Sequence, residues 1–116
     1  MGLQIRMDQV LGRPVLFVVG SGDEALLSRV AKAIVCLMST DDDVRVVNVD
    51  DLLLSDVNAI RAFLAHLVDG DAGERLVLSC NRLSGRRLLR RWGGDDVTIF
   101  ADTSQAVLWA YRNVAL

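Results

Sequence analysis

Residues Val46 to Leu67 read VVNVDDLLLSDVNAIRAFLAHL and combine the patterns of a strand, a loop and a helix. Its valine-rich start predicts a buried strand over residues 44–49, and a loop over residues 50–55 follows. Asp56 then stands where its carboxylate can accept the first backbone N–H groups of a helix over residues 57–68. The apolar residues of that helix recur at spacings of three and four and form one face: Val57, Ile60, Leu64, Leu67 and Val68.

Toward the N-terminus the chain predicts two strands and a helix. Residues 3–10 alternate loosely between apolar and polar, which suits a strand at a sheet edge. Residues 14–19 are almost all apolar, as expected of a strand covered on both faces. Asp23 can cap the helix that follows over residues 24–39. Its apolar face comprises Leu27, Val30, Ala31, Ile34 and Met38.

Toward the C-terminus strand and helix alternate again. We expect strands over residues 76–79 and 97–100, a basic helix over 82–91, and a last helix over 104–115 capped by Thr103. The order is β-β-α-β-α-β-α-β-α. It predicts a single α/β domain over residues 1–116, with a mixed sheet of four or five strands and helices mostly on one side.

Composition narrows the function. The 116 residues are 52% hydrophobic, with a net charge of −2. No apolar run approaches the ~20 residues that a membrane span needs. Residues 1–13 mix charges into short apolar groups, unlike a signal peptide. We therefore expect a cytoplasmic protein, and the acidic balance argues against nucleic acid as its main partner.

No catalytic set is evident, so we expect no enzyme activity, no cofactor and no metal. His66 is the only histidine, and a triad or a metal site cannot be built from one part. Gly20, Ser21 and Gly22 follow a strand and precede a helix, as in a phosphate loop. However, Ala25 replaces the third glycine of that pattern and the lysine is absent, which favours a plain turn.

Two further groups of residues have both a structural and a functional interpretation. Five arginines could grip phosphate or an acidic partner, although a solvated helix face is the more common explanation: Arg82, Arg86, Arg87, Arg90 and Arg91. Cys36 and Cys80 could form a redox pair, although both fit buried small apolar positions better.

The junction Asp56-Val57-Asn58-Ala59 also has two readings. In the structural one, Asp56 caps the helix and Asn58 faces water. In the functional one, Asn58 lies exposed at a helix N-terminus, where a phosphate on Ser or Thr would be stabilised.

Three motifs resemble the STAS domain, named for sulphate transporters and anti-sigma factor antagonists. In VLFVVGSGDEALLSRVAKAI, Gly20 and Asp23 match a strand ending in Gly-Glu-Leu-Asp, and Ser21 and Gly22 replace the middle pair. The stretch VRVVNVDDLLLSDVNAIRAFL resembles the strand, loop and Asp-Ser-Ser-Gly-Leu helix start. There Asp56 matches, and the next four residues differ. RLVLSCNRLSGRRLLRRWGGDDVTIFADTSQAV resembles the last strands and helices.

The resemblance covers nearly the whole chain and is greatest to stand-alone bacterial anti-sigma factor antagonists. It implies a protein that binds an anti-sigma factor, usually a GHKL-type serine kinase, and so frees a sigma factor for transcription. The implied contact surface comprises Gly20, Ser21, Gly22, Asp23, Ser55, Asp56, Val57, Asn58 and Ala59.

In that family the kinase phosphorylates a Ser or Thr two residues after the conserved Asp, and this breaks the complex. The equivalent position is Asn58, whose amide cannot accept a phosphoryl group. The resemblance therefore implies a docking surface without its usual switch. Ser55 is an alternative phosphorylation site, and Cys36 with Cys80 could supply redox control instead.

Three alternatives stay open at this stage. The chain could be the STAS subunit of a lipid-transport ATPase. It could sense a small ligand through the turn at Gly20, Ser21 and Gly22. It could also be a scaffold that binds other STAS proteins or forms a weak homodimer, with an exposed apolar patch around residues 52–54.

Overall fold

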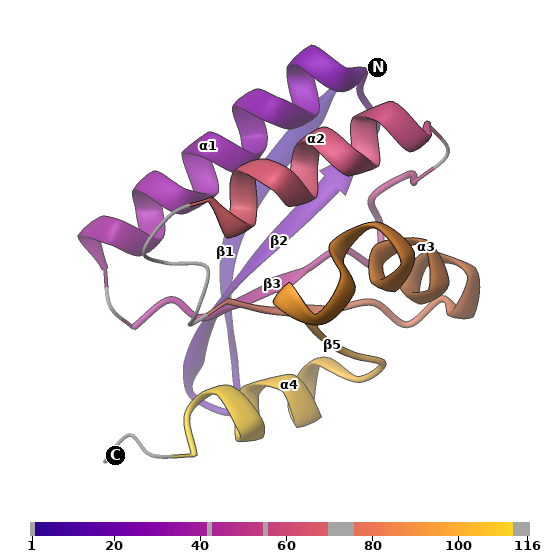
Figure 1. The fold of residues 1–116 in the computed structure, drawn as a ribbon. Helices are drawn as coiled ribbons and strands as arrows, with labels where there is room; N and C mark the ends of the chain where they lie inside the picture. Colours follow the sequence, from indigo (N-terminus) through magenta and orange to yellow (C-terminus); the bar gives the residue numbers. More distant parts are fainter. Residues whose placement is uncertain (1, 42, 55, 70–75, 113–116) are drawn as a thin grey trace.

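The computed structural model describes residues 2–41, 43–54, 56–69 and 76–112. Five strands form one sheet in the order β1-β2-β3-β4-β5, in which β1 is antiparallel to β2 and the other neighbours are parallel (Figure 1). The elements are β1 (Leu3–Val10), β2 (Arg13–Gly20), α1 (Glu24–Thr40), β3 (Val46–Asn48), α2 (Val57–Val68), β4 (Val77–Ser79), α3 (Leu83–Gly93), η2 (Gly94–Asp96), β5 (Thr98–Phe100) and α4 (Thr103–Ala110). The predicted α/β class and element order are confirmed.

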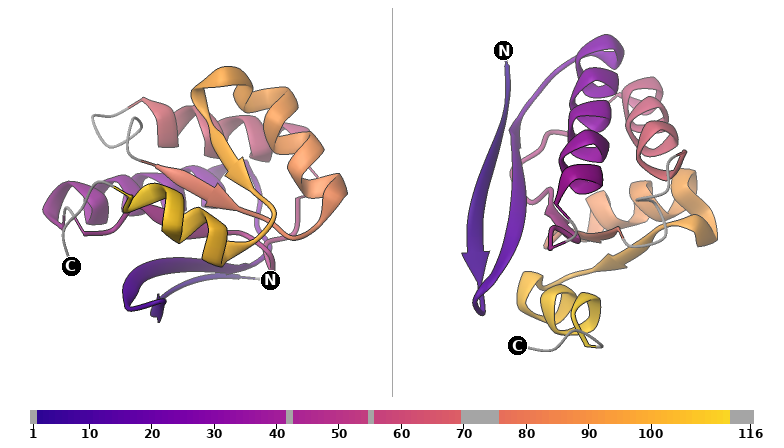
Figure 2. Two further views of the ribbon diagram at one scale, coloured as in Figure 1. Left: turned by 90° about the horizontal axis from the view of Figure 1, so that it is seen from below. Right: turned by 90° about the vertical axis from the view of Figure 1, so that its left-hand side faces the viewer.

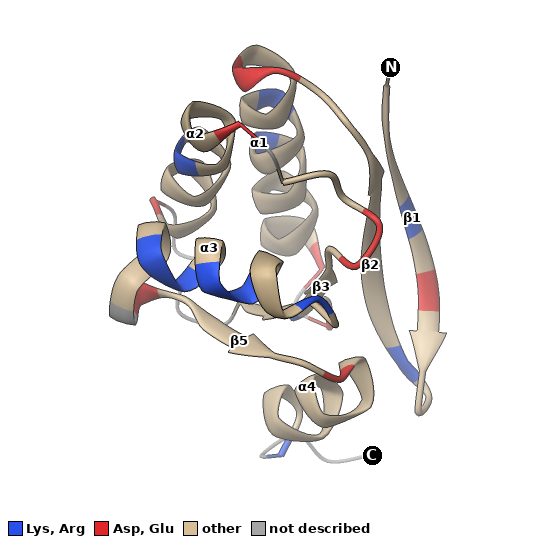
Figure 3. Cartoon of the chain, turned by 90° about the vertical axis from the view of Figure 1, so that its right-hand side faces the viewer, with Lys and Arg blue, Asp and Glu red and all other residues tan. Residues whose placement is uncertain are grey.

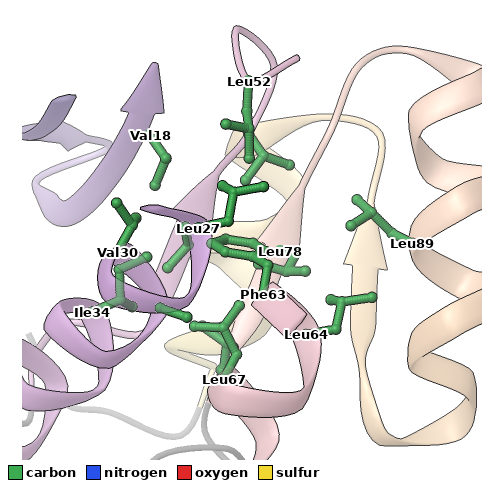
Figure 4. Packing of buried hydrophobic residues seen from close by; sticks show 14 of the residues in the cluster. Val18, Leu27, Val30, Ile34, Leu52, Phe63, Leu64, Leu67, Leu78 and Leu89 are labelled. Atoms are coloured by element: carbon green, nitrogen blue, oxygen red, sulfur yellow. The ribbon is translucent and has the colours of Figure 1, made fainter. Parts of the chain in front are cut away.

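Alternation along the strands assigns each helix to a face of the sheet. Side chains on one face pack against α1, α2 and α3: Leu16, Val18, Val47, Leu78 and Ile99. Their sequence neighbours Val15, Val46 and Val77 pack against α4 on the other face. Figure 2 shows α4 across the strands from the other three helices, and Figure 4 shows Phe63 of α2 at the centre of the larger cluster. Helices therefore lie mostly on one side, as predicted.

Gly20 joins the end of β2 to the loop after β3. Its N–H donates to the carbonyl of Asp51 at 3.1 Å, and its carbonyl accepts the N–H of Leu53 at 2.9 Å. Its φ of +120° is one that residues with a side chain rarely adopt, and a Cβ would lie 2.0 Å from the carbonyl oxygen of Gly2. A glycine is therefore required at this junction.

Two predicted details are wrong. Thr103 does not cap the last helix, because the carboxylate of Asp102 accepts the N–H of Ser104 at 3.0 Å instead. The helix also ends at Ala110 with a turn after it, and residues 113–115 of its predicted extent lie outside the described residues.

Candidate functional site

Two aspartates cap helices at the edge where the parallel strands end. Asp23 accepts the N–H of Leu26 at 2.9 Å and so opens α1. Asp56 accepts the N–H groups of Asn58 at 2.9 Å and Ala59 at 3.4 Å and so opens α2. Because α1 and α2 each follow a parallel strand and pack against each other, their N-termini lie at the same edge (Figure 1). Both predicted caps are confirmed.

Asn58 is exposed in the first turn of α2. Its backbone N–H is bound by Asp56, whereas its side-chain amide makes no hydrogen bond within the described part of the chain. Val57 beside it is 41% exposed, so the surface at the start of α2 presents an apolar side chain next to an amide. Ala59, in contrast, is buried in the core, and its side chain adds nothing to this surface. Ser55 lies outside the described residues.

The turn of Gly20, Ser21 and Gly22 is occupied by contacts within the chain. The N–H of Gly20 donates to Asp51, and the N–H of Ser21 donates to the carbonyl of Gly2 at 3.1 Å. These two donors are therefore not free to cradle a phosphate. The turn supports the loop after β3, and Asp23 is the exposed member of the predicted segment.

The apolar surface at this edge differs from the patch expected over residues 52–54. Leu52 and Leu54 are buried, and only Leu53 is exposed, at 55%. Sequence reasoning missed Leu83 at the start of α3, which is 53% exposed. The guanidinium of Arg82 donates to the carbonyls of Val49 and Leu52 and so ties the start of α3 to the same loop. The edge thus offers three exposed apolar side chains, those of Leu53, Val57 and Leu83.

A buried polar network, also missed from the sequence, holds the loops at this edge. The amide of Asn48 donates to the hydroxyl of Thr103 at 2.7 Å and to the carboxylate of Asp50 at 3.1 Å. The hydroxyl of Thr103 lies 3.1 Å from that of Ser79. Asp50 also accepts the N–H of Asn81 at 2.7 Å. Because buried polar groups need partners, this network fixes the ends of β3 and β4 relative to α4.

The structure does not bring the two cysteines together. Both thiols are free: Cys80 is buried just after β4, whereas Cys36 is exposed, contrary to its predicted burial. Cys36 lies 13 residues after the Asp23 cap, about 20 Å along the helix axis from the edge where β4 ends. A disulfide requires Cα atoms within about 7 Å, so a pair within one chain would need rearrangement.

The described residues offer no assembled catalytic group. Among them no three His, Cys, Asp or Glu side chains are close enough to hold a metal ion. His66 is partly buried on α2 and makes no hydrogen bond with the described part of the chain. No helix in the described ranges is long and apolar enough to cross a membrane. What the edge offers is an exposed surface of polar and apolar side chains.

Comparison with known proteins supports the fold. No protein-family model matches the chain, and no curated protein matches it either. A solved structure from Shewanella loihica PV-4, an uncharacterized protein of the DUF3478 family with a SpoIIAA-like fold, is similar, with a TM-score of 0.55. The likeness covers 94% of this chain and 93% of that one, at 12% sequence identity. The chain therefore has a SpoIIAA-like, that is STAS-like, fold.

Proposed function

We propose that this protein acts by binding, as an anti-sigma factor antagonist or an antagonist-like regulator. Its partner would be an anti-sigma factor of the GHKL serine-kinase type, docked on the edge formed by Asp23, Leu53 and the start of α2. The fold and the resemblance of the three motifs support this proposal. The observation that carries it is Asn58, which is exposed two residues after the capping Asp56 and whose side-chain amide has no hydrogen-bond partner among the described residues.

The position of Asn58 explains why charge there would matter. The carboxylate of Asp56 lies 2.9 Å from the backbone nitrogen of Asn58. A phosphate on residue 58 would add up to two negative charges close to this carboxylate and would change what the partner meets. Asn is neutral, so the surface stays in the form equivalent to the unphosphorylated family member, and binding is not switched off at this residue.

A matched pair of isosteric charge changes tests the proposal. Affinity capture of the tagged protein from its host's lysate, followed by mass spectrometry, should recover a GHKL-type kinase. With the purified kinase, Asn58→Asp should weaken binding about tenfold or more, because it loses an amide donor and adds a charge beside Asp56. Gln105→Glu makes the same change on α4, at an exposed site on the opposite face of the sheet, and should leave the affinity unchanged.

A serine at residue 58 should restore the missing switch. With kinase and ATP, Asn58→Ser should gain a phosphate and leave the complex, whereas Asn58→Ala should stay bound. Recovery of a transporter ATPase or of other STAS proteins alone would contradict the proposal, as would equal binding by Asn58→Asp and the unaltered protein. Repeating the capture without reductant tests whether Cys36 or Cys80 affects the complex.

A further inference from the structure

Trp92 near the end of α3 lies close to two guanidinium groups. The Arg61 guanidinium of α2 is 5.1 Å from the centre of the Trp92 ring, and that of Arg91 is 5.4 Å away. Trp92 is 36% exposed, and both arginines are exposed. An indole ring close to two cations offers an apolar surface and two sites for anions in one place.

A hollow of about 240 Å³ opens beside this ring. It is lined by Arg61, Leu64, Ala65, Val68, Trp92, Gly93 and Asp96. A Cβ on Gly93 would lie 2.6 Å from the Val97 side chain and 3.6 Å from that of Leu64, so only glycine fits there. The hollow between α2 and α3 therefore has a mixed lining, in which apolar side chains such as Leu64, Val68 and Trp92 lie beside the charged groups of Arg61 and Asp96.

Basic residues outnumber acidic ones around this hollow, although Asp96 also lines it. Helix α3 contains four arginines and no acidic residue. Arg61, Arg87 and Arg91 are exposed and make no ion pair within the described part of the chain. Figure 3 shows the basic positions of α3 and of α2, with an acidic position beside the end of α3. Like charges held close together repel each other, and an anionic partner would relieve that repulsion.

We propose that the hollow between α2 and α3 binds an acidic amphipathic segment of a partner protein. An apolar side chain of the segment would occupy the hollow against Trp92, and carboxylates would pair with Arg61 and Arg91. The apolar side chains of Leu64, Val68 and Trp92 in the hollow and the net charge of −2 favour such a segment over nucleic acid, whose binding depends on extended basic surfaces. The surface continues the exposed side of α2 that begins at Asn58, since Arg61 is one turn further along.

The protein's own tryptophans allow a direct test. The chain has two, so Trp109→Phe leaves Trp92 as the sole indole reporter. A synthetic Glu/Leu peptide should change its emission saturably, and added salt should weaken the effect. The same peptide with Lys in place of Glu should produce no saturable change. In Trp92→Phe, the remaining Trp109 should not respond.

Matched charge reversals give the decisive comparison. In the Trp109→Phe background, Arg61→Glu with Arg91→Glu should weaken peptide binding about tenfold or more, because two charge pairs become repulsive. Arg29→Glu with Lys32→Glu makes the same net change at exposed sites of α1 and should have little effect. Circular dichroism checks that both double variants are folded.

Several outcomes would overturn the inference. They are the absence of a saturable change, an equal loss in both double variants, and tighter binding of duplex DNA than of the Glu/Leu peptide. A Trp92 response to added Trp-free protein, with both tryptophans replaced by Phe, would identify the hollow as a self-association site instead. No anti-sigma factor is present in these titrations, so their failure leaves the proposed function untouched.

Discussion

Asn58 and Asn48 show how one residue type has two roles in this chain. Asn58 is exposed and its side-chain amide contacts no described polar group, whereas Asn48 is 4% exposed and its amide donates to Thr103 and Asp50. The sequence signal for the buried role of Asn48 was its position as a polar residue within an apolar strand. Its partner Thr103 is 55 positions away, so local sequence could not identify the contact. The caps Asp23 and Asp56 could be predicted because a cap depends only on the next three residues.

Tyr111 joins α4 to two loops through its hydroxyl group. The hydroxyl accepts the N–H of Arg45 at 3.2 Å and lies within reach of the carbonyls of Pro14 and Asp43. Burial raises the pKa of Tyr111, since the ionised form is poorly solvated there, although the Arg45 N–H and nearby arginines oppose this. The neutral hydroxyl is therefore the form that the folded state prefers.

The raised pKa of Tyr111 predicts how stability changes at alkaline pH. Its contribution is complete below the unfolded value of about 10 and is lost as the pH rises through the folded pKa. Tyr111→Phe should lower the free energy of unfolding at neutral pH by about 1–2 kcal/mol, because buried partners lose their hydrogen bonds. It should also reduce the alkaline decline. Urea unfolding from about pH 7 to 11 measures both, and an identical decline in the variant would contradict the assignment.

Among the elements, the bounds of the first two helices were predicted closely, whereas those of the central strand β3 were not. The expected helix over 57–68 matches α2, and that over 24–39 is one residue shorter than α1. The expected strand over 44–49 shrinks to Val46–Asn48, although Val44 and Val49 are fully buried. A run of apolar residues indicates that a segment is buried. Whether each residue pairs in a sheet depends on the neighbouring strand, whose position the sequence alone does not give.

The start of α4 shows a second case in which neighbouring residues alone do not determine the structure. Asp102 and Thr103 are adjacent and both residue types cap helices well. Asp102 takes the cap, and Thr103 turns toward Asn48 and Ser79 in the polar network. The choice between them depends on a tertiary contact, which is why Thr103 was wrongly predicted as the cap.

The junction between β1, β2 and the loop after β3 depends on Gly20. In Gly20→Ala the new methyl group would meet the carbonyl of Gly2, and φ is already unfavourable for Ala. We expect the free energy of unfolding to fall by about 2–4 kcal/mol, and protection of the Ser21 amide from hydrogen exchange to decrease. Gly12→Ala is the control, because φ is +76° there but nothing lies within 4 Å of the added Cβ. It should cost only about 1 kcal/mol, and equal losses would contradict the steric argument.

At the scale of the whole molecule, the order of elements and the layering followed from the sequence. Alternating strands and helices predicted the parallel part of the sheet, and the extra strand at the front predicted its antiparallel edge. The basic helix was expected as well, but its position relative to the acidic residues was not. The charged residues of α3 are all arginines, while Asp23, Asp51 and Asp56 are exposed near the edge where the parallel strands end. Only the three-dimensional arrangement separates these two surfaces.

The two hydrophobic clusters share the same central strands. Val46 faces α4 and Val47 faces α1 and α2, so neither cluster can form without β3. We therefore expect both sides of the sheet to unfold in one transition. Trp92 on α3 and Trp109 on α4 report on opposite sides, and single-tryptophan variants should give coincident urea unfolding curves.

Val107→Ala tests this coupling from the thinner side of the sheet. Val107 is 2% exposed and packs in the cluster that contains the strand residues Val15, Val46 and Val77. Its truncation to Ala should lower the free energy of unfolding by about 2 kcal/mol. The loss should appear equally in the Trp92 and Trp109 curves, because α4 and α3 unfold together. Leu108→Ala, at a neighbouring position that is 65% exposed, should change stability by less than about 0.5 kcal/mol. The Trp109 transition could instead move to a lower urea concentration while the Trp92 transition stays in place. This result would mean that α4 unfolds separately, and that the sheet with α1, α2 and α3 forms the stable unit.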